Sequence, residues 1–457
     1  AMPMFQPARK NGGIPGMEGS GDGRVLDLDT AVKDGVLGGV GSPAGGYGGG
    51  EIGEKKLDLN KMMEELNSIQ VPSVFICPIS LEPMRDPVTL CTGQTYEKSN
   101  ILKWLGMGHY TCPTTMQELW DDTLTPNRTL HQLIITWFSQ KYVQFKKRSE
   151  DAQGRALELL TNLKKVKGQI RIQNLKELHL LLAAHSTART AVIDAAGLSL
   201  LSSLLGPFTS YAVGSEVVAI LVNLLPLTSE SKSNLMQPAK VSSIIDILNE
   251  GSIDAKLNCI LLIEALMDDR GFCAGAISSP TLSVALMRLL RDKRHPSGHL
   301  PALALLKSLA IHKELQSLIV NIGAVPQLME LIPTWRNPDC VELALFVLDT
   351  LSSVPQGKQA LKDCPKTIPT VVKLLMRISA NCTGHALSIL LSVCKLAPEE
   401  CPLVAVDAGL AAKLLLVIQS GCHQTLKQQA AELLKLCSLN YSDTMFISKC
   451  KLTRTIQ

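Results

Sequence analysis

The 457-residue chain has few aromatic residues and almost no excess of charge of either sign. Aromatic side chains make up 4% of the residues and hydrophobic ones 46%, which is typical of Leu- and Ala-rich helical proteins rather than of β-sandwiches or barrels. The formal net charge is only +4, and the sequence has no long basic stripe of the kind that binds nucleic acid. We therefore expect a mainly α-helical protein without a nucleic-acid partner.

The sequence also lacks a long apolar run and a secretory signal pattern. The longest apolar stretch, 217–227, is short and is broken by Asn223 and Pro226. Ten of the 13 cysteines lie between Cys259 and Cys450 in apolar helical segments, as expected of reduced, buried thiols. These features predict a soluble protein of the cytoplasm, the nucleus or both, with no membrane span.

Composition divides the N-terminal part of the chain. Residues 1–54 hold 16 of the 33 glycines and show no sustained hydrophobic period, so we expect this segment to be disordered. Residues 55–71 are predicted to form a short helical lead-in to the first folded domain. The apolar residues of this lead-in recur at helical spacing at Leu59, Met62, Met63, Leu66 and Ile69.

Residues 72–146 have a different texture, because prolines and glycines interrupt short apolar runs. Turns should therefore dominate this segment. We predict two short strands at 88–90 and 95–96, a helix at 99–105 and a closing helix at 130–144. Together these elements would form a small α+β domain.

From residue 151 to about residue 440 the chain repeats itself. A short apolar helix recurs at steps of 43, 41, 43, 43 and 42 residues, aligned at Leu198, Val241, Leu282, Val325, Ile368 and Leu410. A longer Leu- and Ala-rich helix recurs at steps of 42, 43, 42, 42 and 43 residues, aligned at Leu224, Leu266, Leu309, Leu351, Val393 and Leu436. This period predicts an α-solenoid of stacked helical layers, with an aperiodic helical bundle as the alternative.

Glycines at the entrance of several of the short helices distinguish between solenoid types. Gly197, Gly323 and Gly409 resemble the turn before the second helix of an armadillo repeat. We therefore expect about six armadillo-like repeats after an N-terminal partial repeat, and a C-terminal tail at 441–457.

A series of motifs in the first domain identifies a family resemblance. Residues 75–88 read Phe-Ile-Cys-Pro-Ile-Ser-Leu-Glu-Pro-Met-Arg-Asp-Pro-Val, and residues 93–97 read Gly-Gln-Thr-Tyr-Glu. Ile-Leu-Lys-Trp-Leu at 101–105, Thr-Cys-Pro-Thr-Thr at 111–115 and Leu-Thr-Pro-Asn at 124–127 follow. This order closely resembles the U-box, a zinc-free RING-like domain, along its whole length. A U-box followed by armadillo-like repeats resembles the plant U-box ubiquitin ligases.

The metal-ligand content of this domain agrees with the resemblance. A RING domain needs eight Cys or His ligands for its two zinc ions, mostly in close pairs. The segment contains no Cys-x-x-Cys pair, and its candidate ligands are Cys77, Cys91, His109, Cys112 and His131. Two zinc sites therefore cannot be built, although a single site at His109 and Cys112 is an alternative. We expect neither a metal nor another cofactor.

Without metal, polar side chains must hold the loops together by hydrogen bonds to the turn backbone. The candidates for this network are Glu82, Asp86, Thr92, Tyr96, Glu97, Ser99 and Asn127. The alternative for each is a solvated loop residue.

The sequence contains no evident covalent catalyst. Cys77 and Cys112 lie beside prolines in apolar surroundings without a nearby basic residue, so neither is expected to have a lowered pKa. The resemblance implies that ubiquitin stays as a thioester on a conjugating enzyme until a substrate lysine attacks. The ligase would act by positioning the two reactants.

The family's docking surface can be carried over residue by residue. The resemblance implies a shallow apolar patch for the conjugating enzyme, made of Ile79, Leu81, Trp104 and Pro113. Exposed large apolar side chains are common anchors of such contacts. Core packing is the alternative for the first three.

One departure from the family pattern is Met116. Many U-box and RING domains carry an Arg, Lys or Gln here that hydrogen-bonds ubiquitin and conjugating enzyme, whereas a thioether cannot donate. Two hypotheses therefore stay open: a ubiquitin ligase, and an armadillo adaptor whose U-box only binds. A third, a zinc RING ligase, fails on ligand count.

The repeats are expected to bind a substrate protein on the side lined by the last helix of each repeat. The nuclear-import type of armadillo array lines this groove with recurring asparagines and tryptophans, but here only Asn223 fits. The other aligned positions carry Ala265, Ser308, Thr350, Ser392 and Lys435. Recognition of import signals is thus not expected. The sequence is compatible with a homodimer.

Overall fold

The computed structural model describes residues 58–67, 69–268, 274–277 and 279–451, and the chain divides into two compact units between Ser149 and Glu150. The Gly-rich segment 1–54 lies outside the described residues. Helix α4 (Arg128–Leu163) begins in the first unit and ends in the second.

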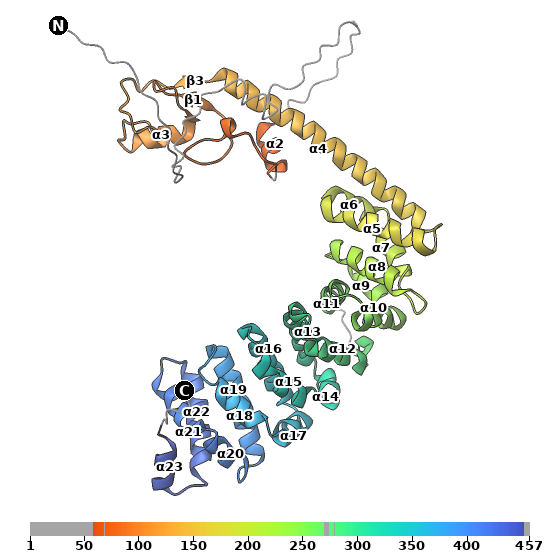
Figure 1. The fold of residues 1–457 in the computed structure, drawn as a ribbon, viewed down its shortest axis with the longest axis vertical. Helices are drawn as coiled ribbons and strands as arrows, with labels where there is room; N and C mark the ends of the chain where they lie inside the picture. Colours follow the sequence, from red (N-terminus) through yellow and green to blue (C-terminus); the bar gives the residue numbers. More distant parts are fainter. Residues whose placement is uncertain (1–57, 68, 269–273, 278, 452–457) are drawn as a thin grey trace, which may run out of the picture. The chain divides into compact units, whose positions relative to one another are not determined.

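The first unit is a small α+β domain built around a three-stranded antiparallel sheet of order β2-β1-β3. Its elements before α4 are α2 (Leu59–Glu65), the 3-10 helix η1 (Ser73–Phe75), β1 (Pro87–Thr89), β2 (Thr95–Glu97), α3 (Lys98–Gly106) and β3 (Thr125–Pro126) (Figure 1). Strands β1 and β2 and helix α3 lie within two residues of their predicted positions, whereas the two-residue strand β3 was not predicted. The closing helix also starts near its predicted position but is much longer, because its apolar spacing continues into the second unit.

One face of α4 supplies much of the core of the first unit. Leu130, Ile134, Trp137 and Phe138 recur at helical spacing and are at most 4% exposed. The ring of Trp137 meets the rings of Phe75 and Phe138 edge to face, with centroids 5.9 and 4.9 Å apart. This core fixes the loops that precede and follow the sheet.

The second unit is a stack of three-helix repeats. It opens with the end of α4 and with α5 (Gly168–Ala184), and its last helix is α23 (Asp443–Lys449), which lies in the segment predicted as a tail. The first helices of the repeats are α6 (Ser186–Asp194), α9 (Ser229–Leu235), the 3-10 helix η2 (Ala274–Ile277), α14 (Lys313–Asn321), α17 (Pro355–Asp363) and α20 (Cys401–Asp407). The second helices are α7 (Gly197–Ser203), α10 (Pro238–Glu250), α12 (Pro280–Arg291), α15 (Ala324–Leu331), α18 (Thr367–Leu374) and α21 (Leu410–Gln419). The third helices are α8 (Tyr211–Asn223), α11 (Ile253–Met267), α13 (His299–Ile311), α16 (Pro338–Leu351), α19 (Ala380–Leu396) and α22 (Gln424–Ser438).

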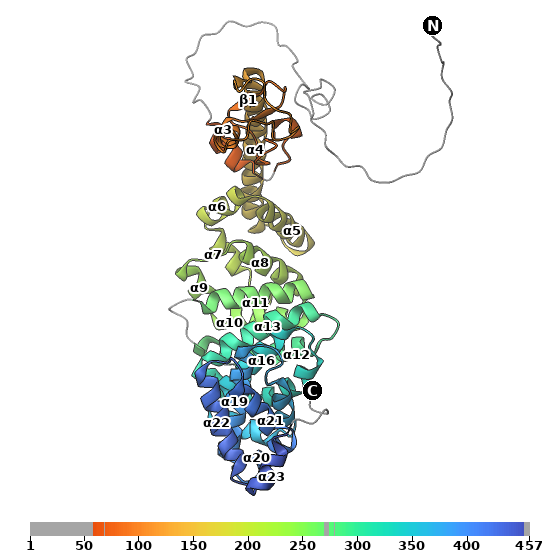
Figure 2. The same cartoon turned by 90° about the vertical axis from the view of Figure 1, so that its left-hand side faces the viewer.

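The third helices pack in sequence order, from α8 to α22, as Figure 2 shows. Both recurring helices predicted from the sequence correspond to the second and third helices of these repeats. The first helix of each repeat was not predicted. It has seven to nine residues, except for the four-residue η2 of the third repeat. Two further 3-10 turns, η3 (Pro296–Gly298) and η4 (Ile332–Thr334), precede α13 and α16.

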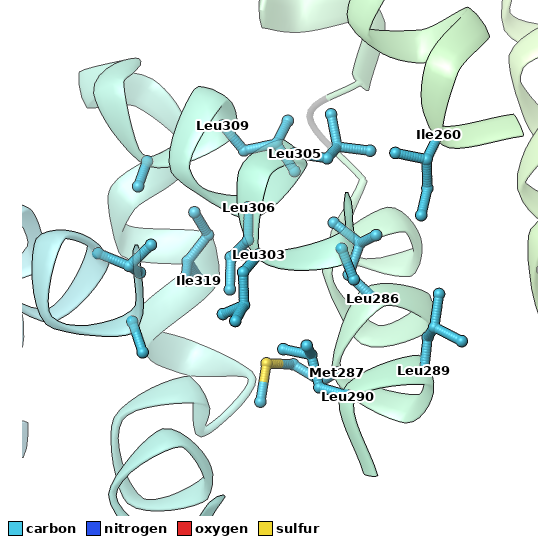
Figure 3. Packing of buried hydrophobic residues seen from close by; sticks show 14 of the residues in the cluster. Ile260, Leu286, Met287, Leu289, Leu290, Leu303, Leu305, Leu306, Leu309 and Ile319 are labelled. Atoms are coloured by element: carbon cyan, nitrogen blue, oxygen red, sulfur yellow. The ribbon is translucent and has the colours of Figure 1, made fainter. Parts of the chain in front are cut away.

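A single continuous hydrophobic core runs through the repeats. Figure 3 shows buried side chains of neighbouring helices packed together, among them Leu286 of α12 and Leu306 of α13, with Ile260 of α11 beside them. These side chains and Ile319 of α14 are fully buried. Because each repeat buries its apolar face only against its neighbours, the stack itself supplies the stability.

The glycines predicted at the helix entrances have two different roles. Gly323 and Gly409 adopt left-handed φ angles of 78° and 91° just before α15 and α21. In the first repeat Ala196 takes this conformation, with φ 58°. A Cβ atom on the next residue, Gly197, would lie 2.5 Å from Cγ1 of Val192. Gly197 is therefore required by packing and not by backbone conformation.

Candidate functional site

Two loops of the first unit have the same pattern of backbone hydrogen bonds. In the first loop, the amide of Cys77 donates to the carbonyl of Glu82 at 2.8 Å, and the amide of Leu81 donates to the carbonyl of Cys77 at 2.9 Å. The second loop repeats both bonds at 2.8 Å, with Cys112, Met116 and Gln117 in the equivalent places. A β-bridge closes each loop, Ile76 with Pro83 and Thr111 with Glu118. The loops are thus structural equivalents.

Each loop exposes one large apolar side chain at a strained position. Leu81 and Met116 have φ angles of 59° and 58°, in the left-handed region that L-residues other than Asn, Asp and Gly rarely adopt. The side chains of these residues are 77% and 65% exposed. An exposed apolar residue in a strained conformation stabilises neither the core nor the loop, so this pair points to a binding role.

Two buried thiols anchor the loops. The sulfur of Cys77 accepts hydrogen bonds from the amide of Glu97 at 3.3 Å and from Nδ2 of Asn100 at 3.7 Å. The sulfur of Cys112 lies 3.0 Å from the hydroxyl oxygen of Tyr96, which also donates to the hydroxyl of Thr114 at 2.8 Å. These contacts connect each loop to β2 or α3. The repeated Cys-Pro pair is the sequence signal for these anchors, and from the sequence it was interpreted only in terms of metal binding and catalysis.

Hydrogen bonding alters the acidity of these groups. Burial alone would raise the pKa of the Cys112 thiol, but hydrogen bonds from the Thr115 and Tyr96 side chains lower this pKa to about 7. Burial raises the pKa of Tyr96 to about 12. Burial alone would also raise the pKa of the Cys77 thiol, but hydrogen bonds from the backbone of Glu97 and Ser80 hold this pKa below its ordinary value. The prediction that neither loop cysteine has a lowered pKa is therefore wrong for both, because their hydrogen-bond partners could not be seen in the sequence. Cys112 is nevertheless fully buried, so a substrate cannot reach its sulfur.

The four residues predicted to dock a conjugating enzyme differ in exposure. Leu81 is highly exposed, Ile79 is 38% exposed, and Trp104 and Pro113 are half-buried. Nε1 of Trp104 donates to the carbonyl of Thr111 at 2.7 Å, and its ring lies 4.4 Å from that of His109. Trp104 therefore ties α3 to the start of the second loop as well as contributing surface.

Several residues of the predicted polar network bond the loop backbone. The carboxylate of Glu97 accepts the amides of Arg85 and Asp86 at 2.6 and 3.0 Å. Oδ1 of Asn127 accepts the amide of Leu130 in the first turn of α4 at 3.0 Å.

The other candidates for that network take different positions. Asp86 forms an exposed ion pair with Lys98 at 3.7 Å, and the hydroxyl of Thr92 is buried. Within the part of the chain that the structure describes, the side chains of Glu82 and Ser99 make no hydrogen bond, and Ser99 is exposed. Sequence reasoning missed His131, whose Nδ1 lies 2.9 Å from the carbonyl oxygen of Arg85.

A chain of side chains crosses three of the third helices of the solenoid. Nζ of Lys307 lies 4.5 Å from the ring centroid of Phe346, and this ring meets that of His385 edge to face at 5.3 Å. Nδ1 of His385 lies 2.8 Å from Oδ2 of Asp349. Cation–π and hydrogen-bond contacts thus connect α13, α16 and α19. The nuclear-import type of armadillo array has recurring asparagines on its third helices instead.

The described residues contain neither a metal-binding cluster nor a single membrane-spanning helix. No group of three or more His, Cys, Asp or Glu side chains there could hold a metal ion. No single helix among them is long and apolar enough to cross a membrane, and two bent helix pairs pass that test by length and composition only.

Comparison with known proteins identifies the family. Residues 71–143 match the family model of the U-box domain, and residues 156–457 match that of the plant U-box protein ARM repeat region. The chain belongs to the plant U-box proteins with armadillo repeats.

Three named relatives are similar to this chain. It is 65% identical to U-box domain-containing protein 30 of Arabidopsis thaliana, with 100% of both chains covered. It is 58% identical to U-box domain-containing protein 75 of Oryza sativa subsp. japonica, covering 95% of this chain and 98% of the relative. A more distant relative, at 27% identity over 83% of this chain and 96% of its own length, is E3 ubiquitin-protein ligase PUB23 of Arabidopsis thaliana.

Proposed function

We propose that this protein is a ubiquitin-protein ligase whose U-box docks a ubiquitin-charged conjugating enzyme while the armadillo repeats hold a substrate protein. The observation that carries the proposal is the pair of equivalent loops, each exposing an apolar residue in a strained conformation, at Leu81 and Met116. Membership of the U-box family and a relative named as a ligase support the same activity.

The proposed mechanism is non-covalent. Both loop thiols are fully buried, so neither can accept ubiquitin as a thioester. The loops and Trp104 would bind the conjugating enzyme and restrict the conformations of its thioester, while the repeats raise the local concentration of substrate lysines. Transfer would then proceed directly from conjugating enzyme to lysine.

A ubiquitination assay with activating enzyme and a panel of conjugating enzymes tests this proposal. Leu81→Asn is the informative variant, because asparagine tolerates the left-handed backbone and removes only the apolar contact. The matched control is Met107→Asn, at the C-terminal end of α3, where an equally exposed side chain has φ −80°. We expect Leu81→Asn to lose at least about 10-fold in rate and the control to keep full rate.

The rival function is an adaptor that binds but does not transfer, and Met116 favours it because its thioether lacks a donor. No ubiquitin transfer with any member of the panel, from a folded full-length chain that still binds a conjugating enzyme, would establish the adaptor instead.

A further inference from the structure

A cavity of about 670 Å³ lies between the third and fourth repeats. Its lining comes from the segment that leads into α13, including Lys293 and Ser297, and from the segment that leads into α16, including Trp335, Arg336 and Asn337. This volume is in the range of cavities that hold small organic groups. The proposed docking of the conjugating enzyme involves the U-box and makes no use of this cavity.

The two charged residues that line the cavity are both cations. Lys293 and Arg336 both line it, and neither forms an ion pair within the described part of the chain. None of the described residues that line it is acidic. The nearby carboxylate of Asp292 is occupied by Nε of Arg294 at 3.2 Å and Nδ1 of His295 at 2.9 Å.

Two neutral side chains that line the cavity carry N–H donors without a partner. Nε1 of Trp335 is buried and has no hydrogen-bond partner among the described residues, although a buried indole N–H normally has one. The Oδ1 atom of Asn337 accepts the amide of Asp339, which leaves the Nδ2 hydrogens of Asn337 available. Asn337 also caps the 14-residue helix α16, whose N-terminal dipole favours an anion.

We propose that this cavity binds the phosphate monoester of a phosphorylated segment of a substrate protein. A phosphate monoester carries close to two negative charges and three acceptor oxygens, which suits two unpaired cations and several donors better than a single carboxylate does. An armadillo solenoid binds extended segments of other proteins, so a phosphorylated side chain is the expected carrier. Substrate capture would then depend on phosphorylation.

The inference rests on the proposed substrate-binding role of the repeats, but its test measures binding without ubiquitin transfer. A full-length chain that binds the phosphopeptide yet transfers no ubiquitin would overturn the ligase and leave the cavity site intact. A chain that transfers ubiquitin but binds the phosphopeptide no better than its unphosphorylated form would overturn the cavity site and leave the ligase proposal intact.

The probe is a degenerate peptide library centred on phosphoserine, compared with libraries centred on serine and glutamate. Binding to the full-length chain is followed by the indole N–H resonances of its four tryptophans, with Trp335→Phe assigning the relevant one. We expect the phosphoserine library to shift the Trp335 resonance and to bind at least about 10-fold more tightly than either other library.

Three substitutions locate the site. Lys293→Gln and Arg336→Gln should each weaken binding at least about 10-fold. Arg294→Gln is the matched control, because Arg294 lies in the same loop but is engaged by Asp292, and it should change binding less than about 2-fold.

Other results would overturn the proposal. Equal binding of the three libraries would exclude phosphate recognition. If Arg294→Gln weakened binding as much as Lys293→Gln and Arg336→Gln, the peptides would be attracted by the overall positive charge and not by this cavity. Inositol hexakisphosphate distinguishes the source of the phosphate: if it alone shifts the Trp335 resonance, the ligand is a soluble phosphate compound and not a protein segment.

Discussion

At the scale of single residues, the left-handed conformations of Leu81 and Met116 lower the stability of the first unit, while their exposed side chains are proposed to bind the conjugating enzyme. A left-handed conformation costs an L-residue roughly 1 to 2 kcal/mol, and asparagine less. Met116→Asn should therefore keep or raise the free energy of unfolding of the first unit while it lowers the affinity for conjugating enzymes. Urea denaturation and a binding titration measure the two effects. If Met116→Asn lost stability and kept its affinity, the binding role of this residue would be refuted.

The buried pair of Tyr96 and Cys112 gives a second prediction for single residues. Tyr96→Phe removes the hydroxyl that contacts Cys112 and Thr114, leaving both without that partner. We expect a loss of about 1 to 3 kcal/mol in the free energy of unfolding of the first unit. Thermal unfolding followed by circular dichroism measures this loss. An unchanged melting temperature would show that the loop does not need this anchor.

The lowered pKa of Cys112 also makes stability depend on pH. Because the folded pKa, about 7, is below the ordinary value of 9.0, the thiolate is favoured by folding. Its stabilising contribution should be complete above pH 9 and should disappear as the pH falls through 7. The test is the difference in unfolding free energy between wild type and Cys112→Ala at several pH values, since this difference removes the titration of other groups. A difference that does not vary between pH 6 and pH 9.5 would contradict the assignment.

At the scale of helices, replacing a glycine by alanine should change the free energy of unfolding in opposite directions at two positions. Gly154 lies within α4 with no atom within 4 Å of an added Cβ, so Gly154→Ala should stabilise the chain by about 0.5 to 1 kcal/mol. Gly197→Ala would place Cβ 2.6 Å from the carbonyl oxygen of Val192 and should destabilise by about 1 to 3 kcal/mol. Denaturant midpoints of the two variants test this contrast. Equal shifts of the same sign would show that α6 and α7 pack differently.

The predictability of each element depended on its length and on the range of its contacts. The second and third helices of the repeats were predicted because their period recurs, and α3, β1 and β2 because turn residues bound them. The two residues of β3 are too few to show a strand pattern. The equivalence of the two loops was missed, since Cys77 and Cys112 are 35 positions apart and their Asn100 and Tyr96 partners come from α3 and β2. Positive φ angles at Leu81 and Met116 also cannot be predicted from residues that normally avoid them.

The whole molecule combines two units with separate hydrophobic cores. The first unit buries its own cluster, from Met62 to Tyr142, and the repeats bury another. A chain ending at Ser149 should therefore fold and still discharge a conjugating enzyme onto free lysine, but it should not modify a substrate protein. Parallel assays with free lysine and with a genuine substrate measure the two activities. If the shortened chain modified the substrate protein as fully as the whole chain does, the repeats would not be the substrate-binding part of the molecule.

The most direct test of the account is single-turnover discharge of a ubiquitin-charged conjugating enzyme onto free lysine by the full-length chain, in the presence of a zinc chelator. We predict acceleration that resists the chelator, falls at least about 10-fold in Leu81→Asn, and proceeds without a ubiquitin thioester on the ligase. No acceleration across the panel of conjugating enzymes, or a thioester on a cysteine of this chain, would contradict the proposed transfer by positioning.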